Sequence, residues 1–249
     1  MNKLSVVVTC EHGGHEVPAP FTFCFEGAEE VLLSHRGWDP GALDLAFRIS
    51  RACETPLYFA TTTRLLVELN RSRHAPDLFS EYSAMLSRKQ KQYLLNQYYY
   101  PYRNEVGLHI SNLREQGKQV LHLSIHSFTP VLHGKPRTTE IGLLFDPSRS
   151  AETDFCKSWA TTLGQALPGR SIEDNQPYAG TDDGFTTALR KRYDDPGYLG
   201  IELEVRQDLL LGKEYVKIVD GLVESLLAAI KKYAGDCDQL PEADSLVIA

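Results

Sequence analysis

Short apolar runs alternate with longer amphipathic stretches along the chain. Leu4–Cys10 has the sequence LSVVVTC, which is rich in β-branched residues and is followed by a glycine pair, so it predicts a buried strand. Similar runs predict strands at Thr55–Phe59, Arg64–Leu69, Val120–Ile125, Glu140–Phe145 and Gly200–Val205. Apolar positions at helical spacing predict helices at Gly41–Glu54, Ser80–Gln116 (interrupted at Pro101), Thr153–Leu167, Gly184–Arg192 and Lys213–Tyr233.

The alternation of strands and helices predicts an α/β domain whose mainly parallel sheet is covered on both faces. No internal repeat or linker divides the chain, so we expect residues 1–235 to form one domain. Residues 236–249 are acidic and contain a proline, and we expect them to form a loosely ordered tail. In such a sheet, functional residues lie in loops at the carboxyl ends of the strands.

Charge and hydropathy exclude several classes of partner. Of 249 residues, 26 are Lys or Arg and 33 are Asp or Glu, which gives a net charge of −7. A nucleic-acid-binding surface needs clustered basic residues, so we expect no nucleic-acid partner. No apolar run approaches the ~18–20 residues of a membrane span, and the N-terminus lacks a signal-peptide core. We therefore expect a cytoplasmic protein without a membrane partner.

Cysteine usage favours reduced thiols. The five cysteines are scattered and form no C-x-x-C pair, which argues against a disulfide framework or a cysteine-based zinc site. Cys10 lies two residues before His12, so a cysteine nucleophile remains an alternative at that position.

Polar residues that a core would reject follow several predicted strands. Glu11, His12, His15 and Glu16 follow the first strand, His126 follows Val120–Ile125, and His35 and Asp39 precede the first helix. Each histidine alone is more typical of a hydrogen-bonded structural residue. Together, two histidines and a carboxylate at strand ends make a zinc site with an open fourth position. The glycines at 13 and 14 permit close approach of the backbone there.

Glu202 and Glu204 occupy alternate positions of an apolar strand and so point to the same face. Unpaired buried carboxylates are costly. Either this is an edge strand with that face in water, or one glutamate serves as a general base beside the metal.

Basic residues near these motifs suggest an anionic substrate. Arg64 and Arg71 flank an apolar run, with Asn70 beside the second arginine. A guanidinium can hold a carboxylate with two hydrogen bonds, and an asparagine amide can add a third donor. A solvated pair of salt-bridged arginines is the alternative. Arg137, in the sequence KPRTT, is a further candidate cation for substrate binding.

The order of these motifs resembles that of the N-formylglutamate amidohydrolase family. The resemblance runs from about Val6 to Gln207, and it rests on CEHGGHEVP, SHRGWDPGA, TRLLVELNRS, HSFTPVLHGKPR, NQPYAGTDDG and GIELEVRQ. It implies a fold similar to that of zinc carboxypeptidases and aspartoacylase. That fold is a single three-layer α/β domain with a mixed, mainly parallel central sheet flanked by helices (phosphorylase/hydrolase-like, zinc-exopeptidase-like).

The resemblance also implies roles for individual residues. His12 and His126 match metal ligands and Glu204 matches the general base, while Asn70, Arg71 and Arg64 match residues that grip a substrate carboxylate. Tyr178, in the segment NQPY, is similar to a tyrosine that donates its phenol to substrate.

The carboxylate ligand departs from the related pattern. Carboxypeptidases use H-x-x-E, but here His15 occupies the glutamate position. We favour Asp39 as the third ligand, with Glu16 and Glu11 as alternatives.

The expected function is therefore a zinc-dependent amidohydrolase that acts on a small anionic N-acyl amino acid. N-formyl-L-glutamate is the first candidate substrate, although the first motif is C-E-H-G-G rather than the P-H-x-G type of the deformylases of histidine breakdown. A peptidase or amidase acting on a carboxylate-terminated peptide is the alternative enzyme. A catalytically silent ligand-binding member of the family is the alternative from another class.

Overall fold

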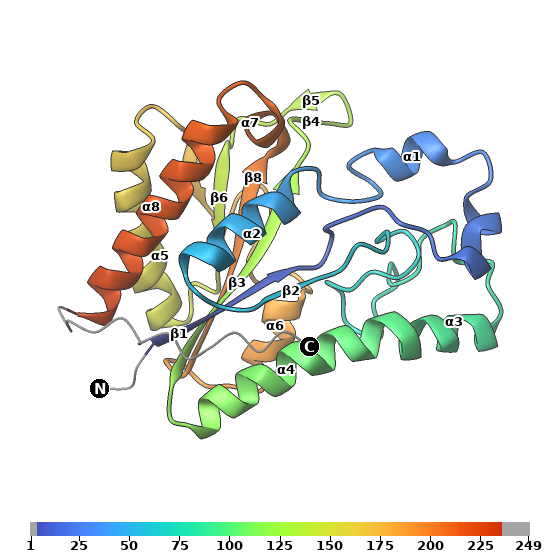
Figure 1. The fold of residues 1–249 in the computed structure, drawn as a ribbon, viewed down its shortest axis with the longest axis horizontal. Helices are drawn as coiled ribbons and strands as arrows, with labels where there is room; N and C mark the ends of the chain where they lie inside the picture. Colours follow the sequence, from blue (N-terminus) through green and yellow to red (C-terminus); the bar gives the residue numbers. More distant parts are fainter. Residues whose placement is uncertain (1–3, 236–249) are drawn as a thin grey trace.

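A six-stranded sheet lies at the centre of the computed structural model, which describes residues 4–235 (Figure 1). The strand order is β2-β1-β3-β8-β6-β7. The four strands β2, β1, β3 and β8 are parallel, whereas β6 runs antiparallel to β8 and parallel to β7. The strands are β1 (Leu4–Cys10), β2 (Leu57–Phe59), β3 (Gln119–Phe128), β6 (Ile141–Leu144), β7 (Ile172–Asp174) and β8 (Tyr198–Arg206).

Helices cover both faces of this sheet. One face carries α2 (Ala42–Ala52), α5 (Ser150–Ala166) and α8 (Tyr215–Ala234), with α7 (Gln207–Leu211) in contact with β8 and α8. These helices enclose the main core, which includes the fully buried Phe155 and Trp159. The other face carries α4 (Tyr100–Glu115) and α6 (Phe185–Arg190), whose apolar side chains pack on residues of β1, β3 and β8. The result is a three-layer domain (Figure 1).

A side region lies to the right of the sheet in Figure 1. It contains a small apolar core in which Phe21 and Phe25 pack with Leu65, Leu66 and Leu94. Its regular elements are η1 (Ala19–Phe25), α1 (Glu29–Leu33), α3 (Arg88–Leu94) and the π-helical turn η2 (Leu95–Tyr99). A separate hairpin is formed by β4 (Val131–Leu132) and β5 (Lys135–Pro136).

The fold class predicted from the sequence is confirmed. The domain is α/β, its sheet is mixed and mainly parallel, and helices flank it on both sides. The short strand β7 was not predicted. The predicted tail, residues 236–249, lies outside the described residues. Within residues 4–235, no helix combines the length and the apolar character that crossing a membrane requires.

The strand predicted at Arg64–Leu69 is wrong, because these residues form turns. The backbone N–H of Leu66 donates to the carbonyl of Thr63, and the N–H of Glu68 donates to the carbonyl of Leu78. The hydroxyls of Ser80 and Ser83 donate to the carbonyl of Leu65. The polar backbone groups are thus satisfied without a neighbouring strand, while the leucines fill the apolar core of the side region.

The predicted helix Ser80–Gln116 is shorter at its start. It begins after Ser87, whose side chain forms a reciprocal capping box with Gln90. The predicted interruption at Pro101 takes the form of the π-helical turn η2, and Pro101 lies in the first turn of α4. Because proline has no N–H to donate to Gln97, a local change of helical hydrogen bonding accommodates it.

One prediction concerns stability. The carboxylate of Glu152 is fully buried and accepts hydrogen bonds from Arg190 Nε at 3.0 Å and from the Gly200 N–H at 3.0 Å. Glu152→Gln leaves the buried guanidinium without its counter-charge, so we expect a loss of about 3–5 kcal/mol in the free energy of unfolding. Urea unfolding measures this loss.

The exposed pair Arg48–Asp220 is the matched control, because both of its side chains are about half exposed. Asp220→Asn is expected to change the free energy of unfolding by less than about 1 kcal/mol. Equal effects of the two substitutions would contradict a special role for the buried pair.

Candidate active site

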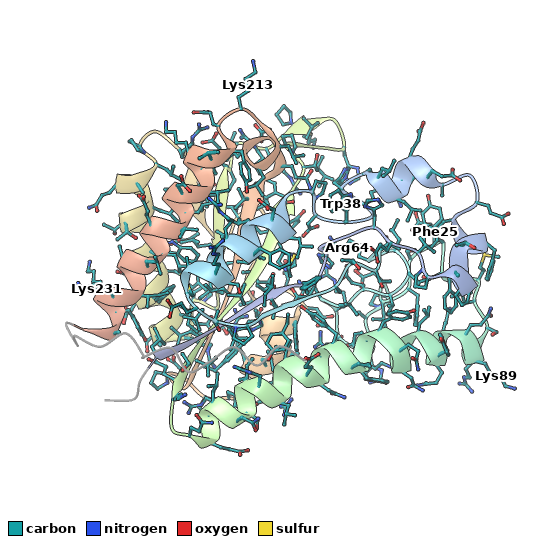
Figure 2. All side chains as sticks on the ribbon, viewed as in Figure 1. Phe25, Trp38, Arg64, Lys89, Lys213 and Lys231 are labelled. Carbon is teal, nitrogen blue, oxygen red and sulfur yellow. The ribbon has the colours of Figure 1, made fainter. Side chains whose placement is uncertain are left out.

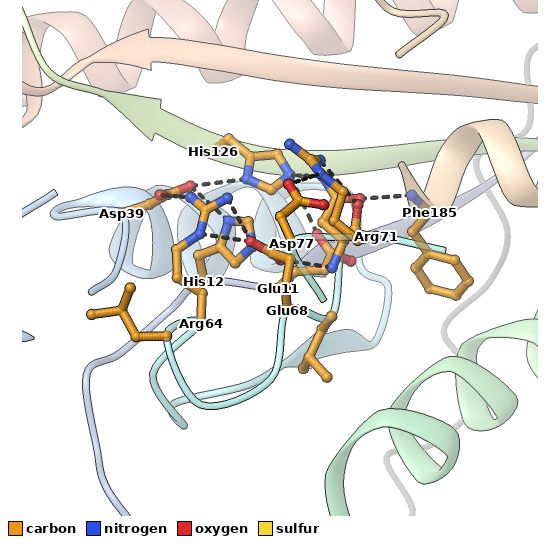
Figure 3. A network of polar contacts seen from close by, with 12 residues as sticks. Glu11, His12, Asp39, Arg64, Glu68, Arg71, Asp77, His126 and Phe185 are labelled. Carbon is orange, nitrogen blue, oxygen red and sulfur yellow. Dashed lines mark hydrogen bonds and ion pairs between the residues drawn. The ribbon is translucent and has the colours of Figure 1, made fainter. Parts of the chain in front are cut away.

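Two histidines and an aspartate converge at the carboxyl ends of the parallel strands (Figure 3). His12 follows β1, His126 lies near the end of β3, and Asp39 precedes α2. Asp39 Oδ2 lies 2.9 Å from His126 Nδ1 and 3.3 Å from His12 Nδ1. All three residues are buried, and one ligand atom from each lies within 4.8 Å of the others. We call these residues the His12–Asp39–His126 trio.

Close backbone packing places the first histidine. The Gly13 N–H donates to the carbonyl of Ala60 at 2.9 Å, and a Cβ on Gly14 would lie only 2.6 Å from the carbonyl oxygen of Thr61. Any larger residue at position 14 would therefore push the two segments apart. The glycine pair allows the chain after β1 to turn against the segment that follows β2.

A second carboxylate fixes the orientation of each histidine ring. Glu68 Oε1 lies 2.5 Å from His12 Nε2, and Glu11 Oε2 lies 3.4 Å from His126 Nε2. The Ser124 hydroxyl, 2.9 Å from His126 Nε2, also donates to Glu11 Oε2 at 2.6 Å. In the neutral ring that a metal binds, a proton on Nε2 leaves the Nδ1 lone pair directed into the trio, as in protein zinc sites. In the protonated ring, Nδ1 of His126 donates to Asp39 Oδ2 instead.

Burial and charge oppose each other throughout this network. Burial alone would raise the pKa of Glu68, but Arg64 and His12 hold that pKa well below its usual range. Burial alone would lower the pKa of His126, but its hydrogen bonds to Asp39 and Glu11 raise that pKa well above its usual value. The surrounding carboxylates thus favour positive charge at the centre of the trio.

The residues of the trio fit a divalent metal. Two imidazole Nδ1 atoms and one carboxylate oxygen are the ligands that a catalytic zinc site uses, with a position left for water or substrate. Carboxylates already orient both histidine rings, and their negative charges favour a cation at the trio. The alternative ligands, Glu11 and Glu16, are placed differently. Glu11 contacts Nε2 of His126, whereas the trio is formed by the other ring nitrogen, Nδ1. Glu16 is exposed and accepts a hydrogen bond from the Thr61 hydroxyl.

Glu204 faces the cavity beside the trio, and its Oε2 is buried without a hydrogen-bond partner among the described residues. Burial raises its pKa to about 8, although the charge of His126 opposes that rise. Its neighbour on the same face, Glu202, accepts a hydrogen bond of 2.7 Å from the Thr186 hydroxyl. Both glutamates line the cavity, and β8 is an inner strand, so the edge-strand alternative is wrong.

The cavity has a volume of about 170 Å³ and opens beside the trio. Arg64, Asn70, Arg71 and Tyr178 also line it, so four of the five predicted substrate-binding residues lie at this site. Arg71 is partly exposed there, and its Nη1 donates to the Asp183 carbonyl at 2.9 Å while its Nε pairs with Asp77 at 3.2 Å.

Arg137, the remaining candidate, reaches the cavity through Tyr178. Its Nη1 and Nη2 lie 3.0 and 3.1 Å from the Tyr178 hydroxyl oxygen. Its guanidinium also stacks on the rings of Phe128 and Tyr178, at 5.3 and 5.0 Å from their centroids. Because the guanidinium can only donate, the phenol oxygen accepts and its own hydrogen is available to another partner.

Arg64 and Asn70 have protein partners at the site. The Arg64 guanidinium contacts Asp39 Oδ1 at 3.2 Å and Glu68 Oε2 at 2.7 and 2.8 Å (Figure 3). In Figure 2, Arg64 lies within the outline of the molecule, whereas Lys213 and Lys231 project beyond the ribbon. Asn70 Oδ1 accepts from the Phe185 N–H at 2.7 Å. The substrate contacts predicted for these two residues remain predictions.

The structure adds Glu68 to the site and argues against Cys10 as a nucleophile. Glu68 was not identified, although a single charged residue within the apolar run LLVEL is the signal that could have indicated it. The alternative of a nucleophile at Cys10 is not supported, because the thiol is fully buried and burial raises its pKa well above the usual value.

Solved structures with the same fold are known. A gene product of Agrobacterium tumefaciens is 27% identical with a TM-score of 0.79, and the match covers 92% of this chain and 91% of that one. An N-formylglutamate amidohydrolase from Ralstonia eutropha JMP134 is 17% identical with a TM-score of 0.70, and the match covers 94% of this chain and 95% of that one. No curated protein sequence matches the chain.

The sequence also matches a protein family directly. The match is to the family described as N-formylglutamate amidohydrolase and extends over residues 4–211, which includes every residue of the site. Since it covers well over half of the chain, the resemblance seen in the motifs is confirmed: this chain belongs to the N-formylglutamate amidohydrolase family.

Proposed function

We propose that this protein hydrolyses the amide bond of a small N-acylated acidic amino acid, with N-formyl-L-glutamate as the first candidate substrate. The observation that carries the proposal is the position of Glu204. Its unpartnered carboxylate oxygen faces the cavity that the His12–Asp39–His126 trio and Arg71 also line. A metal site, a base and a cation in one cavity are the groups that hydrolysis of an anionic amide requires.

His12, Asp39 and His126 would hold the metal, and we propose Zn²⁺ because two imidazoles and one carboxylate suit it. When bound, the metal supplies Lewis-acid polarisation of the amide carbonyl and lowers the pKa of water. Glu68 and Glu11 would keep the histidine rings in place.

Glu204 would move the protons of the reaction. Its carboxylate lines the same cavity as the trio, and its buried Oε2 makes no hydrogen bond within residues 4–235 that would have to break first. In its ionised form it can accept a proton from the attacking water, and it can then deliver that proton to the leaving amine nitrogen, which makes the amine a better leaving group. Glu202 is less suited to this role, because the Thr186 hydroxyl already occupies one of its oxygens.

Arg71 and Tyr178 would orient the substrate. Arg71 is partly exposed at the cavity and can direct its guanidinium toward a substrate carboxylate. Tyr178, whose oxygen accepts from Arg137, can donate its hydroxyl hydrogen to the substrate.

The size of the cavity favours a small substrate over a peptide. Sites for drug-sized ligands are about 300–1,000 Å³, whereas this cavity is about 170 Å³.

The four described cysteines are free thiols, and we propose the cytoplasm as the compartment.

The direct experiment is a deacylation screen of N-formyl, N-acetyl and longer N-acyl derivatives of aspartate and glutamate. We expect release of glutamate from the N-formyl compound, loss of that activity after chelation, and recovery on addition of Zn²⁺. Hydrolysis of carboxylate-terminated peptides alone would favour a peptidase. No turnover by the metal-loaded protein would favour a ligand-binding role.

Glu204→Gln tests the proton transfer. The substitution removes the base but keeps the size of the side chain, so we expect kcat to fall by about 10²–10⁴-fold with little change in KM or bound metal. Glu202→Gln is the matched control on the same strand, with a much smaller expected loss. If the control lost more activity than Glu204→Gln, the two roles would be exchanged.

Arg71→Lys tests the contact with the substrate carboxylate. Lysine keeps the charge but lacks the planar fork, so we expect kcat/KM for N-formyl-L-glutamate to fall about tenfold or more. The diamide of N-formylglutamate, which has no carboxylate, serves as the control substrate and should be hydrolysed slowly by both proteins. An unchanged kcat/KM for the acid would remove Arg71 from the substrate site.

A further inference from the structure

The loop from Arg64 to Asn70 contacts the His12–Asp39–His126 trio, because Arg64 pairs with Asp39 and Glu68 with His12. The start of the loop is tied to the segment that carries Asp39, because the Thr63 hydroxyl and the Arg64 N–H both donate to the carbonyl of Gly37, at 2.9 and 3.2 Å. Its end is tied to α6 through Asn70 and the Phe185 N–H. Polar side chains from this loop therefore reach the trio from a fixed backbone.

Within this loop, Arg64 connects Asp39, a member of the trio, with Glu68, which contacts another member, His12. Its Nη1 lies 3.2 Å from Asp39 Oδ1, and its Nη2 and Nε lie 2.7 and 2.8 Å from Glu68 Oε2. The other oxygen of each carboxylate faces a histidine: Asp39 Oδ2 contacts His12 and His126, and Glu68 Oε1 contacts His12 Nε2. The guanidinium is thus one step removed from the ligand atoms (Figure 3).

The Glu68 carboxylate has three hydrogen-bonding partners. Besides Arg64 and His12, it accepts a hydrogen bond of 2.9 Å from the backbone N–H of Asn70. Its side chain is only 7% exposed and that of Asp39 only 4%. Two carboxylates this deeply buried need a positive partner, and Arg64 supplies it to both.

We propose that Arg64 and Glu68 are positioning residues of the metal centre, and that Arg64 acts on metal retention rather than on the substrate carboxylate. This inference rests on the proposed function, because it assumes that the trio holds a metal. With Oδ1 of Asp39 taken by Arg64, Oδ2 is directed at the site as a single-oxygen ligand. With Nε2 of His12 taken by Glu68, Nδ1 is directed there as well.

Arg71 makes different contacts although it lies in the same stretch of sequence. Its partners are Asp77 and the Asp183 carbonyl, and neither of them contacts the trio. The same Arg→Lys exchange at the two positions therefore separates a role in holding the metal centre from a general effect of losing a guanidinium at the cavity.

The test measures Zn²⁺ affinity directly, by competition with a chelating dye after the purified full-length protein has been stripped of metal. We expect Arg64→Lys and Glu68→Gln each to weaken Zn²⁺ binding by about 10–100-fold, the usual effect of removing the partner of a ligand. Arg71→Lys should bind Zn²⁺ as the wild type does. Thermal unfolding of the metal-free variants checks that each is folded, and the isosteric Glu68→Gln provides a second test if Arg64→Lys does not fold.

The KM for N-formyl-L-glutamate at saturating Zn²⁺ gives a second, independent readout. We expect a KM near the wild-type value for Arg64→Lys and a raised KM for Arg71→Lys. Wild-type Zn²⁺ affinity together with a raised KM for Arg64→Lys would overturn the inference and make Arg64 a substrate ligand. Wild-type Zn²⁺ affinity in Glu68→Gln would equally contradict it.

His126→Ala separates this inference from the proposed function. Tight Zn²⁺ binding by the wild type and its loss in His126→Ala would support the metal centre, whatever Arg64→Lys does. Full retention of Zn²⁺ by His126→Ala, or no tight binding by the wild type, would contradict the metal centre itself. The two failures are therefore distinguishable.

Discussion

The burial of several carboxylates at one edge of the sheet is the constraint on which this site depends. Glu11, Asp39 and Glu68 are almost completely shielded from water, and Glu204 lies beside them. Isolated charges in such a place are unstable, so each needs a hydrogen-bonded positive partner. Arg64 and the two histidines serve the first three. Glu204 has no such partner for Oε2, which explains why its pKa rises while the pKa values of the others fall.

This constraint also accounts for the irregular backbone of residues 64–70. A strand would have pointed Arg64, Leu66 and Glu68 to one face and Leu65 and Val67 to the other. The turns keep Arg64 and Glu68 together in one network of buried carboxylates. They also direct Leu66, together with Leu65, into the apolar core of the side region instead of toward those carboxylates. The leucines anchor the loop, and Arg64 and Glu68 on either side of them reach the His12–Asp39–His126 trio.

Much of the site could be predicted because strand ends are visible in the sequence. His12 and Glu204 lie at or beyond the carboxyl ends of apolar runs, and parallel strands bring those ends together. What could not be predicted is which partner each polar group takes. The pairing of Glu68 with His12 joins residues 56 positions apart and depends on how the intervening loop folds. Because a strand was expected in place of that loop, the contact of Glu68 with the His12–Asp39–His126 trio could not be foreseen.

The two arginines show why residue type alone does not assign a role. Arg64 and Arg71 flank the same apolar run and offer the same planar fork. Arg64 meets two buried carboxylates that depend on a positive partner to stay charged, so its guanidinium is committed to them. Arg71 meets a backbone carbonyl and an exposed carboxylate, which are weak competitors because water can replace them. In the function we propose, a substrate carboxylate would therefore displace the partners of Arg71 at low cost, whereas displacing those of Arg64 would disturb Asp39 and His12.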